Sequence, residues 1–160
     1  MVHEMLKNTP YFYGVIILKN NMELLSSVLK TTQMGQIGIR AVTNYAIGAD
    51  LKAELKSQLK EYDTIEQEAN TIANLRGWDP KELDPAVKAM AKACTRASLM
   101  GSRKDSRIAA MMIHGNTMGM IKTIKNQHHC TEKHDARIDQ LTQKLLDCER
   151  ANIQSMQRYL

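Results

Sequence analysis

The sequence predicts an all-α protein, and three observations support this fold class. Apolar residues recur at the i, i+3, i+4, i+7 spacing of helices along four long stretches. Aromatic residues make up only 4% of the chain, whereas methionine occurs eleven times, a composition that suits packed helices better than sheets. Helix start and stop signals separate the stretches. With 160 residues, the chain is long enough to form one domain with a buried core.

The N-terminal residues 1–21 differ from everything that follows. Segment 11–18 is a short cluster of aromatic and β-branched residues, which is typical of a strand. It is too short to span a bilayer, and no small-residue cleavage site follows it. Helical periodicity begins only near Met22. We therefore predict an N-terminal appendage at 1–21 and a helical domain at 22–160.

The next two stretches predict a pair of antiparallel helices at 22–47 and 51–76. Gly48 ends the first and Asp50 caps the second, so the turn between them is short. Trp78 follows the glycine that ends the second helix and is placed to fold back on its last turn. The first helix is expected to face inward with Leu25, Val28, Thr32, Gly35, Gln36, Ile39, Val42 and Ala46. The second is expected to face inward with Leu51, Leu55, Tyr62, Ile65, Ala69 and Ile72.

A long connection at 77–105 carries a short extra helix. Asp84 and Pro85 open this helix as cap and first helical residue, and Gly101 closes it. Its apolar side consists of Val87, Met90, Ala91, Cys94 and Ser98.

The methionine-rich stretch 106–126 predicts the third long helix, with Ser102 and Asp105 spaced as a capping box ahead of it. A glycine costs roughly 1 kcal/mol in a helix interior, so two glycines four residues apart indicate close packing against another helix. The apolar stripe that contains them is Ile108, Met111, Met112, Gly115, Met118 and Gly119. A second stripe on the opposite side is Ile113, Met120 and Ile124, which we expect to take part in self-association together with the appendage.

The last long helix runs to Leu160, with Thr131 or Asp135 as its cap. Its expected inward residues are Ile138, Leu141, Leu145, Cys148, Glu149, Asn152 and Met156. Two helices, a long crossover and two further helices predict a four-helix bundle with one long connection.

Particular stretches resemble a known superfamily. The run GQIGIRAVTNYAIGADLKAELKSQLKEYDTIEQEANTIANLRG resembles the first helical hairpin of small ferritin-like bacterial proteins. The runs IAAMMIHGNTMGMI and LLDCERANIQSMQRYL are similar to the second hairpin of a bacterial branch that lacks most of the di-iron ligands. The resemblance covers residues 22–160 and implies a ferritin-like four-helix bundle.

Active ferritin-like enzymes hold two metal ions with a carboxylate on each of two helices and Glu-x-x-His on the other two. Here the amide of Gln36 and the phenol of Tyr62 occupy the axis of the first hairpin, and Gly115 occupies the axis of the third helix. Only Glu149 supplies a carboxylate, and Asn152 replaces the histidine of its motif. We therefore expect a degenerate metal site, with no catalytic residue and no cofactor.

A lone buried carboxylate at Glu149 needs hydrogen-bonding partners, because burying it unpaired costs several kcal/mol. We predict a buried polar contact among Gln36, Tyr62, Glu149 and Asn152, in which the amide of Gln36 donates to the carboxylate. A remnant ligand-binding role for Glu149 is the alternative.

The loop before the last helix concentrates His128, His129, Cys130 and His134. These side chains are good ligands for zinc, copper or nickel. Their spacing matches no zinc-site pattern, so we expect an exposed polar loop, with metal binding as the alternative.

Bulk properties narrow the function classes. The three cysteines are an odd number without a secretory signal, which favours a reducing cytoplasm and no disulfide framework. The net charge of +5 is scattered, so it does not favour nucleic acid as a partner, and no segment predicts a membrane partner. We expect a non-enzymatic scaffold or interaction protein that self-associates, with a dimer favoured. The alternatives are a metal-binding ferritin-like protein and a basic protein that coats DNA.

Overall fold

The structure is a computed structural model that describes residues 20–101 and 104–160. The apolar cluster at 11–18 and the cap expected at Ser102 lie outside the described residues. Within the described ranges the chain is all-helical and contains no β-strand. Its elements are α3 (Asn21–Thr43), α4 (Ala49–Arg76), α5 (Pro85–Ser98), α6 (Lys104–His129), α7 (Ala136–Met156) and the short 3-10 helix η2 (Gln157–Tyr159).

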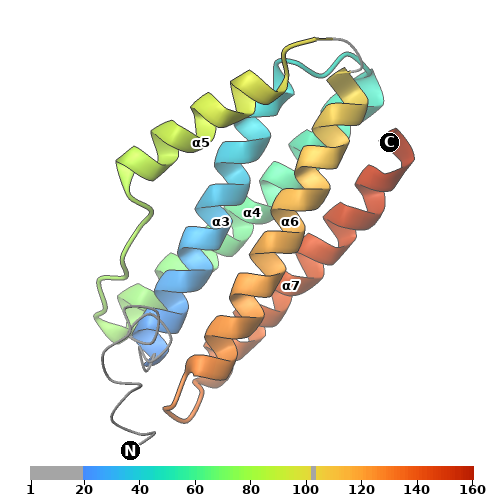
Figure 1. The fold of residues 1–160 in the computed structure, drawn as a ribbon. Helices are drawn as coiled ribbons and strands as arrows, with labels where there is room; N and C mark the ends of the chain where they lie inside the picture. Colours follow the sequence, from blue (N-terminus) through green and yellow to red (C-terminus); the bar gives the residue numbers. More distant parts are fainter. Residues whose placement is uncertain (1–19, 102–103) are drawn as a thin grey trace, which may run out of the picture.

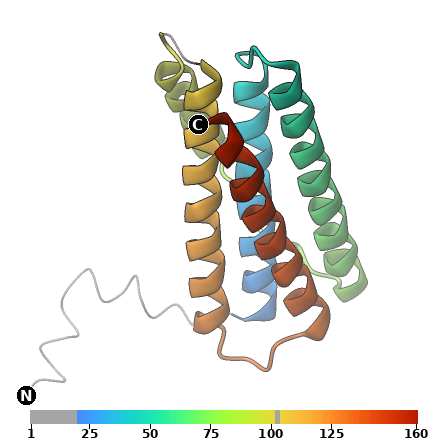
Figure 2. The same ribbon diagram turned by 90° about the vertical axis from the view of Figure 1, so that its right-hand side faces the viewer.

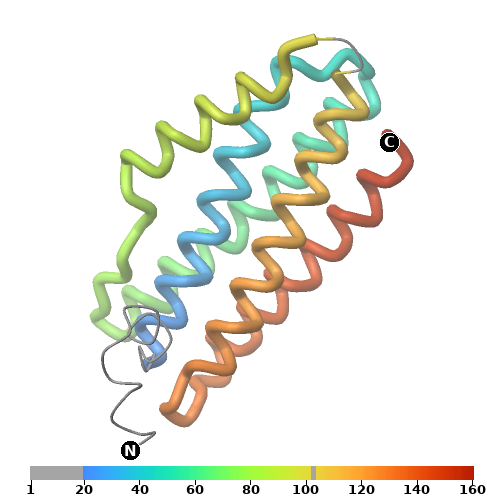
Figure 3. The backbone as a smooth tube through the Cα atoms, in the orientation of Figure 1, coloured from blue at the N-terminus to red at the C-terminus, as the bar shows by residue number. Residues whose placement is uncertain are grey.

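Four long helices, α3, α4, α6 and α7, lie side by side (Figures 1 and 2). Each helix contacts two neighbours that run in the opposite direction, since α3 packs on α4 and α6, and α7 packs on α4 and α6. The chain trace in Figure 3 shows that α4 ends at one end of the molecule and α6 begins at the other. The connection between them therefore runs back along α3 and carries α5 on the outer side of that helix (Figure 1).

The core is built from the apolar faces of the four long helices. The inward faces predicted for α3, α4 and α7 are confirmed, except that Gly35 and Cys148 are only half-buried. The largest fully buried side chains are Leu24, Leu25, Leu29, Ile39, Leu51, Leu55, Tyr62, Ile65, Leu99, Ile108, Ile138 and Leu141. Removal of these surfaces from water is the main favourable term in folding, at roughly 25 cal/mol per Å² of apolar area.

Several helix ends follow local signals that the sequence already carries. Gly77 ends α4 in the left-handed conformation with φ of 64°, and the N–H of Trp78 then donates back to Ala73 at 2.9 Å. Asp84 caps α5 by accepting from the N–H of Ala86 at 2.7 Å. Asp135, rather than Thr131, caps α7. One cap was not anticipated, because Asn20 and Glu23 form a capping box at the start of α3.

The turn between α3 and α4 departs from the prediction. Helix α3 ends at Thr43, and Ile47 is 73% exposed. Gly48, not Asp50, occupies the N-cap of α4. The carboxylate of Asp105 accepts hydrogen bonds from the N–H groups of Ile47 and Gly48, at 2.7 and 2.8 Å. The carboxylate of Asp105 therefore supplies a long-range cap to another helix, a contact that the sequence did not indicate.

Helix α6 is rotated relative to the prediction. Gly115 is exposed and Met118 is 52% exposed, although both were expected to face the core. The buried face of α6 is instead Ile108, Ala109, Met112, Asn116, Thr123 and Asn126. Three of these six residues are polar, so a pattern of apolar residues alone could not locate the face. The second stripe of Ile113, Met120 and Ile124 is half-buried rather than a free outer surface.

Gly35 of α3 packs closely against the ring of Tyr62 on α4. A Cβ atom added to Gly35 would lie 2.5 Å from Cζ of the Tyr62 ring, and the ring is 1% exposed, so it has little room to move. Gly38, one turn further along α3, provides a matched comparison. A Cβ atom added there would meet no atom of the described residues within 4 Å.

We predict that Gly35→Ala destabilises the protein, because overpacking against a buried ring costs roughly 1–3 kcal/mol. Gly38→Ala should leave stability unchanged or raise it by up to about 1 kcal/mol, since alanine favours the helix. Urea unfolding of both variants and the wild type measures the difference. Equal stabilities of the two variants would contradict the packing of Tyr62 against α3.

Candidate functional site

An open groove with a cavity of about 830 Å³ lies between α3, α5 and α6, and its floor reaches α4 and α7. Glycines and methionines from α3 and α6 form much of its lining. These are Met34, Gly35, Gly38, Met111, Met112, Gly115, Met118 and Gly119. Helix α5 packs on α3 but buries none of its own residues, so it forms a wall of the groove without closing it.

The two glycines of α6 differ in what lies beside them. A Cβ atom added to Gly115 would meet no described atom within 4 Å, so the predicted close helix contact at Gly115 is wrong and the space beside it is open. A Cβ atom added to Gly119 would lie 2.1 Å from Oε1 of Glu149. Gly119 therefore makes room for a carboxyl group rather than for a neighbouring helix.

Glu149 of α7 lies at the floor of this groove. Its side chain is only 2% exposed, and Oε2 is buried without a hydrogen-bond partner among the described residues. Burial disfavours the charged carboxylate and raises the pKa of Glu149 to about 8. At neutral pH the groove therefore contains a predominantly protonated carboxyl group that still lacks a partner.

Beside Glu149, a cluster of hydrogen bonds joins three of the long helices. The hydroxyl of Tyr62 donates to Oδ1 of Asn116 at 2.8 Å, and Nδ2 of Asn152 donates to the same oxygen at 3.2 Å. Asn116 in turn donates from Nδ2 to the carbonyl of Met112 at 2.7 Å. The predicted cluster therefore contains Tyr62 and Asn152, but its centre is Asn116. The sequence could have indicated this residue, because Asn116 lies four positions after Met112 on the same helical face.

Gln36 does not contact Glu149 as predicted. Its Nε2 donates at 2.8 Å to both Asp63 and Glu66 of α4. Both donor hydrogens of the amide are thus used by carboxylates, and hydrogen bonds to charged acceptors are stronger than those to neutral ones. Gln36 belongs to a separate polar network between α3 and α4, which also includes Gln33.

The other titratable groups near Glu149 hold their protons strongly. Burial, together with smaller contributions from the neighbouring Glu149 and Glu61, raises the pKa of the Cys148 thiol to about 11. Burial, followed by the nearby Glu149, raises the pKa of Tyr62 well above its ordinary value. Thiolate and phenolate forms are therefore rare at neutral pH, so neither group is an activated nucleophile.

The histidines and cysteine predicted for the loop do not converge, and His128 and His129 lie in the last turn of α6 rather than in a loop. His129 lines the groove, whereas His128 and His134 border a separate depression, where His134 lies 2.9 Å from a carboxylate oxygen of Asp139. The Sγ atom of Cys130 points to the carbonyl of Glu132 at 3.9 Å. Neighbouring helical residues such as His128 and His129 point about 100° apart, which explains their separation. Within residues 20–101 and 104–160, no three His, Cys, Asp or Glu side chains are grouped so that they could hold an ion.

Comparisons with protein-family models, with characterised proteins and with solved structures found no match. Among the described residues, no helix combines the length and the apolar character needed to cross a membrane. All three cysteines are free thiols.

We predict that Glu149 makes stability depend on pH. Between about pH 4.5 and 8 the carboxyl is ionised in the unfolded chain but protonated in the folded protein, so the folded state binds more protons. Stability therefore falls as pH rises through this window, by on the order of 5 kcal/mol at most. The side chain in Glu149→Gln cannot ionise, so the stability of this variant should lack this dependence on pH.

Urea unfolding of the wild type and of Glu149→Gln over this pH range tests the prediction. The variant should become more stable relative to the wild type as pH rises. The exposed Glu61 supplies the control, since Glu61→Gln should follow the wild type more closely. Parallel curves for the wild type and Glu149→Gln would show that Glu149 does not titrate abnormally.

Proposed function

We propose that this protein is a non-enzymatic binding protein, with a ferritin-like four-helix arrangement whose groove holds an apolar ligand. One observation carries the proposal: Glu149 is buried and unpartnered at the floor of an open groove of about 830 Å³. The helix order supports the ferritin-like arrangement, because two antiparallel pairs are separated by one long crossover with its own short helix.

The lining of the groove suits a bound organic molecule. Binding sites for small molecules are typically concave and apolar, with a few polar groups that fix the orientation of the ligand. Methionine side chains are flexible and polarisable, so they adapt to ligands of irregular shape. An unsatisfied buried polar group costs roughly 1–3 kcal/mol, and a ligand that hydrogen-bonds to Glu149 would recover that cost.

The same features argue for binding rather than catalysis. The groups around Glu149 are neutral amides, a phenol and a thiol, and burial keeps the last two protonated. A general base or nucleophile needs a pKa near the working pH and a partner within hydrogen-bonding reach. Glu149 has a pKa of about 8 but lacks such a partner among the described residues.

A metal-binding role is the alternative function and has less support. It would depend on Glu149 or on His128, His129, Cys130 and His134. These side chains do not lie together, since Glu149 and His129 line the groove whereas His128 and His134 border the separate depression. Metal analysis of the purified protein separates this alternative from an organic ligand.

We predict that the full-length protein self-associates. Exposed apolar side chains support this, namely Met118 and Ile121 of α6, which line the groove, and Met90 of α5. Light scattering at micromolar concentration should detect a dimer, and a shortened protein that begins at Asn20, which keeps the cap of α3, tests the part of the preceding residues. A monomeric full-length protein would contradict self-association.

We also propose a cytoplasmic location, because all three cysteines are free thiols.

We predict that Gly115→Leu blocks the groove without unfolding the protein. Its Cβ enters open space, and leucine is a better helix former than glycine. The affinity for an anilinonaphthalene sulfonate dye should fall by at least about tenfold, equivalent to 1.4 kcal/mol. The melting temperature should stay the same or rise.

The matched control is Thr117→Leu, which adds the same side chain to an exposed position of α6 outside the groove. This variant should bind the dye as the wild type does. If Gly115→Leu and the wild type bind the dye equally well, the groove is not the binding site.

A further inference from the structure

We propose that the ligand of the groove is a single-chain amphiphilic anion. Its alkyl chain would lie in the methionine-lined part of the groove, and its carboxylate or phosphate would bind Lys30 and Lys125. This inference rests on the proposed binding function, and it adds the chemical class of the ligand and the direction in which it lies.

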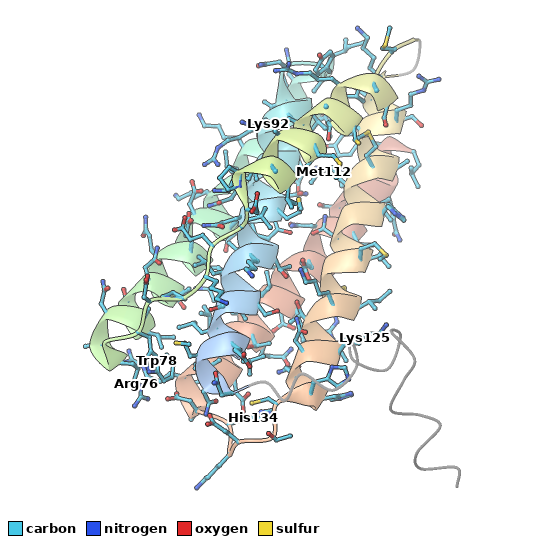
Figure 4. All side chains as sticks on the ribbon, turned by 60° about the vertical axis from the view of Figure 1, so that its left-hand side comes forward. Arg76, Trp78, Lys92, Met112, Lys125 and His134 are labelled. Carbon is cyan, nitrogen blue, oxygen red and sulfur yellow. The ribbon has the colours of Figure 1, made fainter. Side chains whose placement is uncertain are left out.

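The groove changes character along its length. On α6, Lys125 lies six residues after Gly119, and Met111 lies eight residues before it. At 1.5 Å per residue these positions are about 9 Å and 12 Å from Gly119 in opposite directions. Figure 4 shows the same separation, with Lys125 and Met112 at different levels of α6.

Helix α3 lines the groove in the same way, with a lysine toward one end and an apolar side chain toward the other. It runs antiparallel to α6, so residues early in α3 lie beside residues late in α6. Lys30 therefore lines the same end of the groove as Lys125, and Val42 lines the same end as Met111. One end of the groove is basic and the other is apolar, which matches the two parts of an amphiphile.

The charges of Lys30 and Lys125 are not neutralised within the described chain. Lys30 and Lys125 form no ion pair with a residue in 20–101 or 104–160, whereas Lys144 on the other side of the molecule pairs with Glu68. Lys30 is also half-buried, so an anion bound beside it would be less screened by solvent than at an open surface.

Glu149 is compatible with an anionic ligand. It is the one acidic residue among the described residues that line the groove. Because its pKa is about 8, it is mainly protonated at neutral pH and adds little repulsion. A protonated carboxyl can both donate and accept a hydrogen bond, so it can contact a polar group near the head of the amphiphile.

Three amphiphiles with the same alkyl chain test the inference on the full-length protein. They are laurate, dodecanol and dodecyltrimethylammonium, each used below its micelle concentration and measured by calorimetry or by displacement of the dye. Laurate should bind at least about tenfold more tightly than the cation, equivalent to 1.4 kcal/mol. Its affinity should also fall as salt is added. Lauryl phosphate is a fourth test ligand. Whichever of laurate and lauryl phosphate binds more tightly identifies the head group as a carboxylate or a phosphate.

Variants locate the head-group contact. The double variant Lys30→Ala/Lys125→Ala should lose at least about tenfold in affinity for laurate and little for dodecanol. Lys92→Ala supplies the control, because Lys92 is exposed on α5 and does not line the groove (Figure 4). This variant should bind laurate as the wild type does.

The outcomes separate the two proposals. If dodecanol or the cation binds as tightly as laurate, or if the double variant binds laurate normally, the inferred ligand class is wrong while the groove remains a binding site. Inorganic phosphate that binds as tightly as lauryl phosphate would also overturn the amphiphile. If neither the dye nor any of the amphiphiles binds, or if Gly115→Leu binds them all normally, the proposed binding function itself fails.

Discussion

The side chain of Tyr62 connects the four long helices at the centre of this molecule. Its ring packs against the backbone of Gly35 on α3, and its hydroxyl donates to Asn116 on α6. The same acceptor oxygen receives a hydrogen bond from Asn152 on α7. A residue of α4 therefore connects to all three other long helices within one buried cluster. Because a buried polar group must be satisfied, these bonds also fix the rotation of α6 and α7 about their axes.

The groove follows from this arrangement. Asn116 faces the core, so the two glycines and the exposed Met118 of α6 turn toward the space between α3 and α5. An efficient core would fill such a space, since cavities lower stability. Here the chain keeps it open with small residues and places an unpaired carboxyl group at its floor. Departures of this kind from good packing and polar satisfaction are expected mainly at functional sites.

The electrostatics of the groove favour recognition over chemistry. Desolvation keeps Glu149, Tyr62 and Cys148 protonated, and two lysines without ion-pair partners among the described residues lie at one end. Under the proposal above, such a site would attract an anion to its basic end, with the apolar part of the groove beyond it. The polarity comes from the antiparallel run of α3 and α6, which brings Lys30 and Lys125 to the same end although they are far apart in sequence.

The sequence by itself determined the helices and the inner faces of α3, α4 and α7. The signals involved are local: apolar residues at helical spacing, the glycine that ends α4, and the Asp84 cap act within a few residues of where they stand. Only the tertiary structure decided the rotation of α6, the partners of Gln36, the long-range cap by Asp105 and the isolation of Glu149. Each of these depends on which polar groups meet across helices, and a polar residue can face either water or a buried partner. Hydropathy does not distinguish these two cases, so Asn116 and the groove beside it emerge only when the helices are packed together.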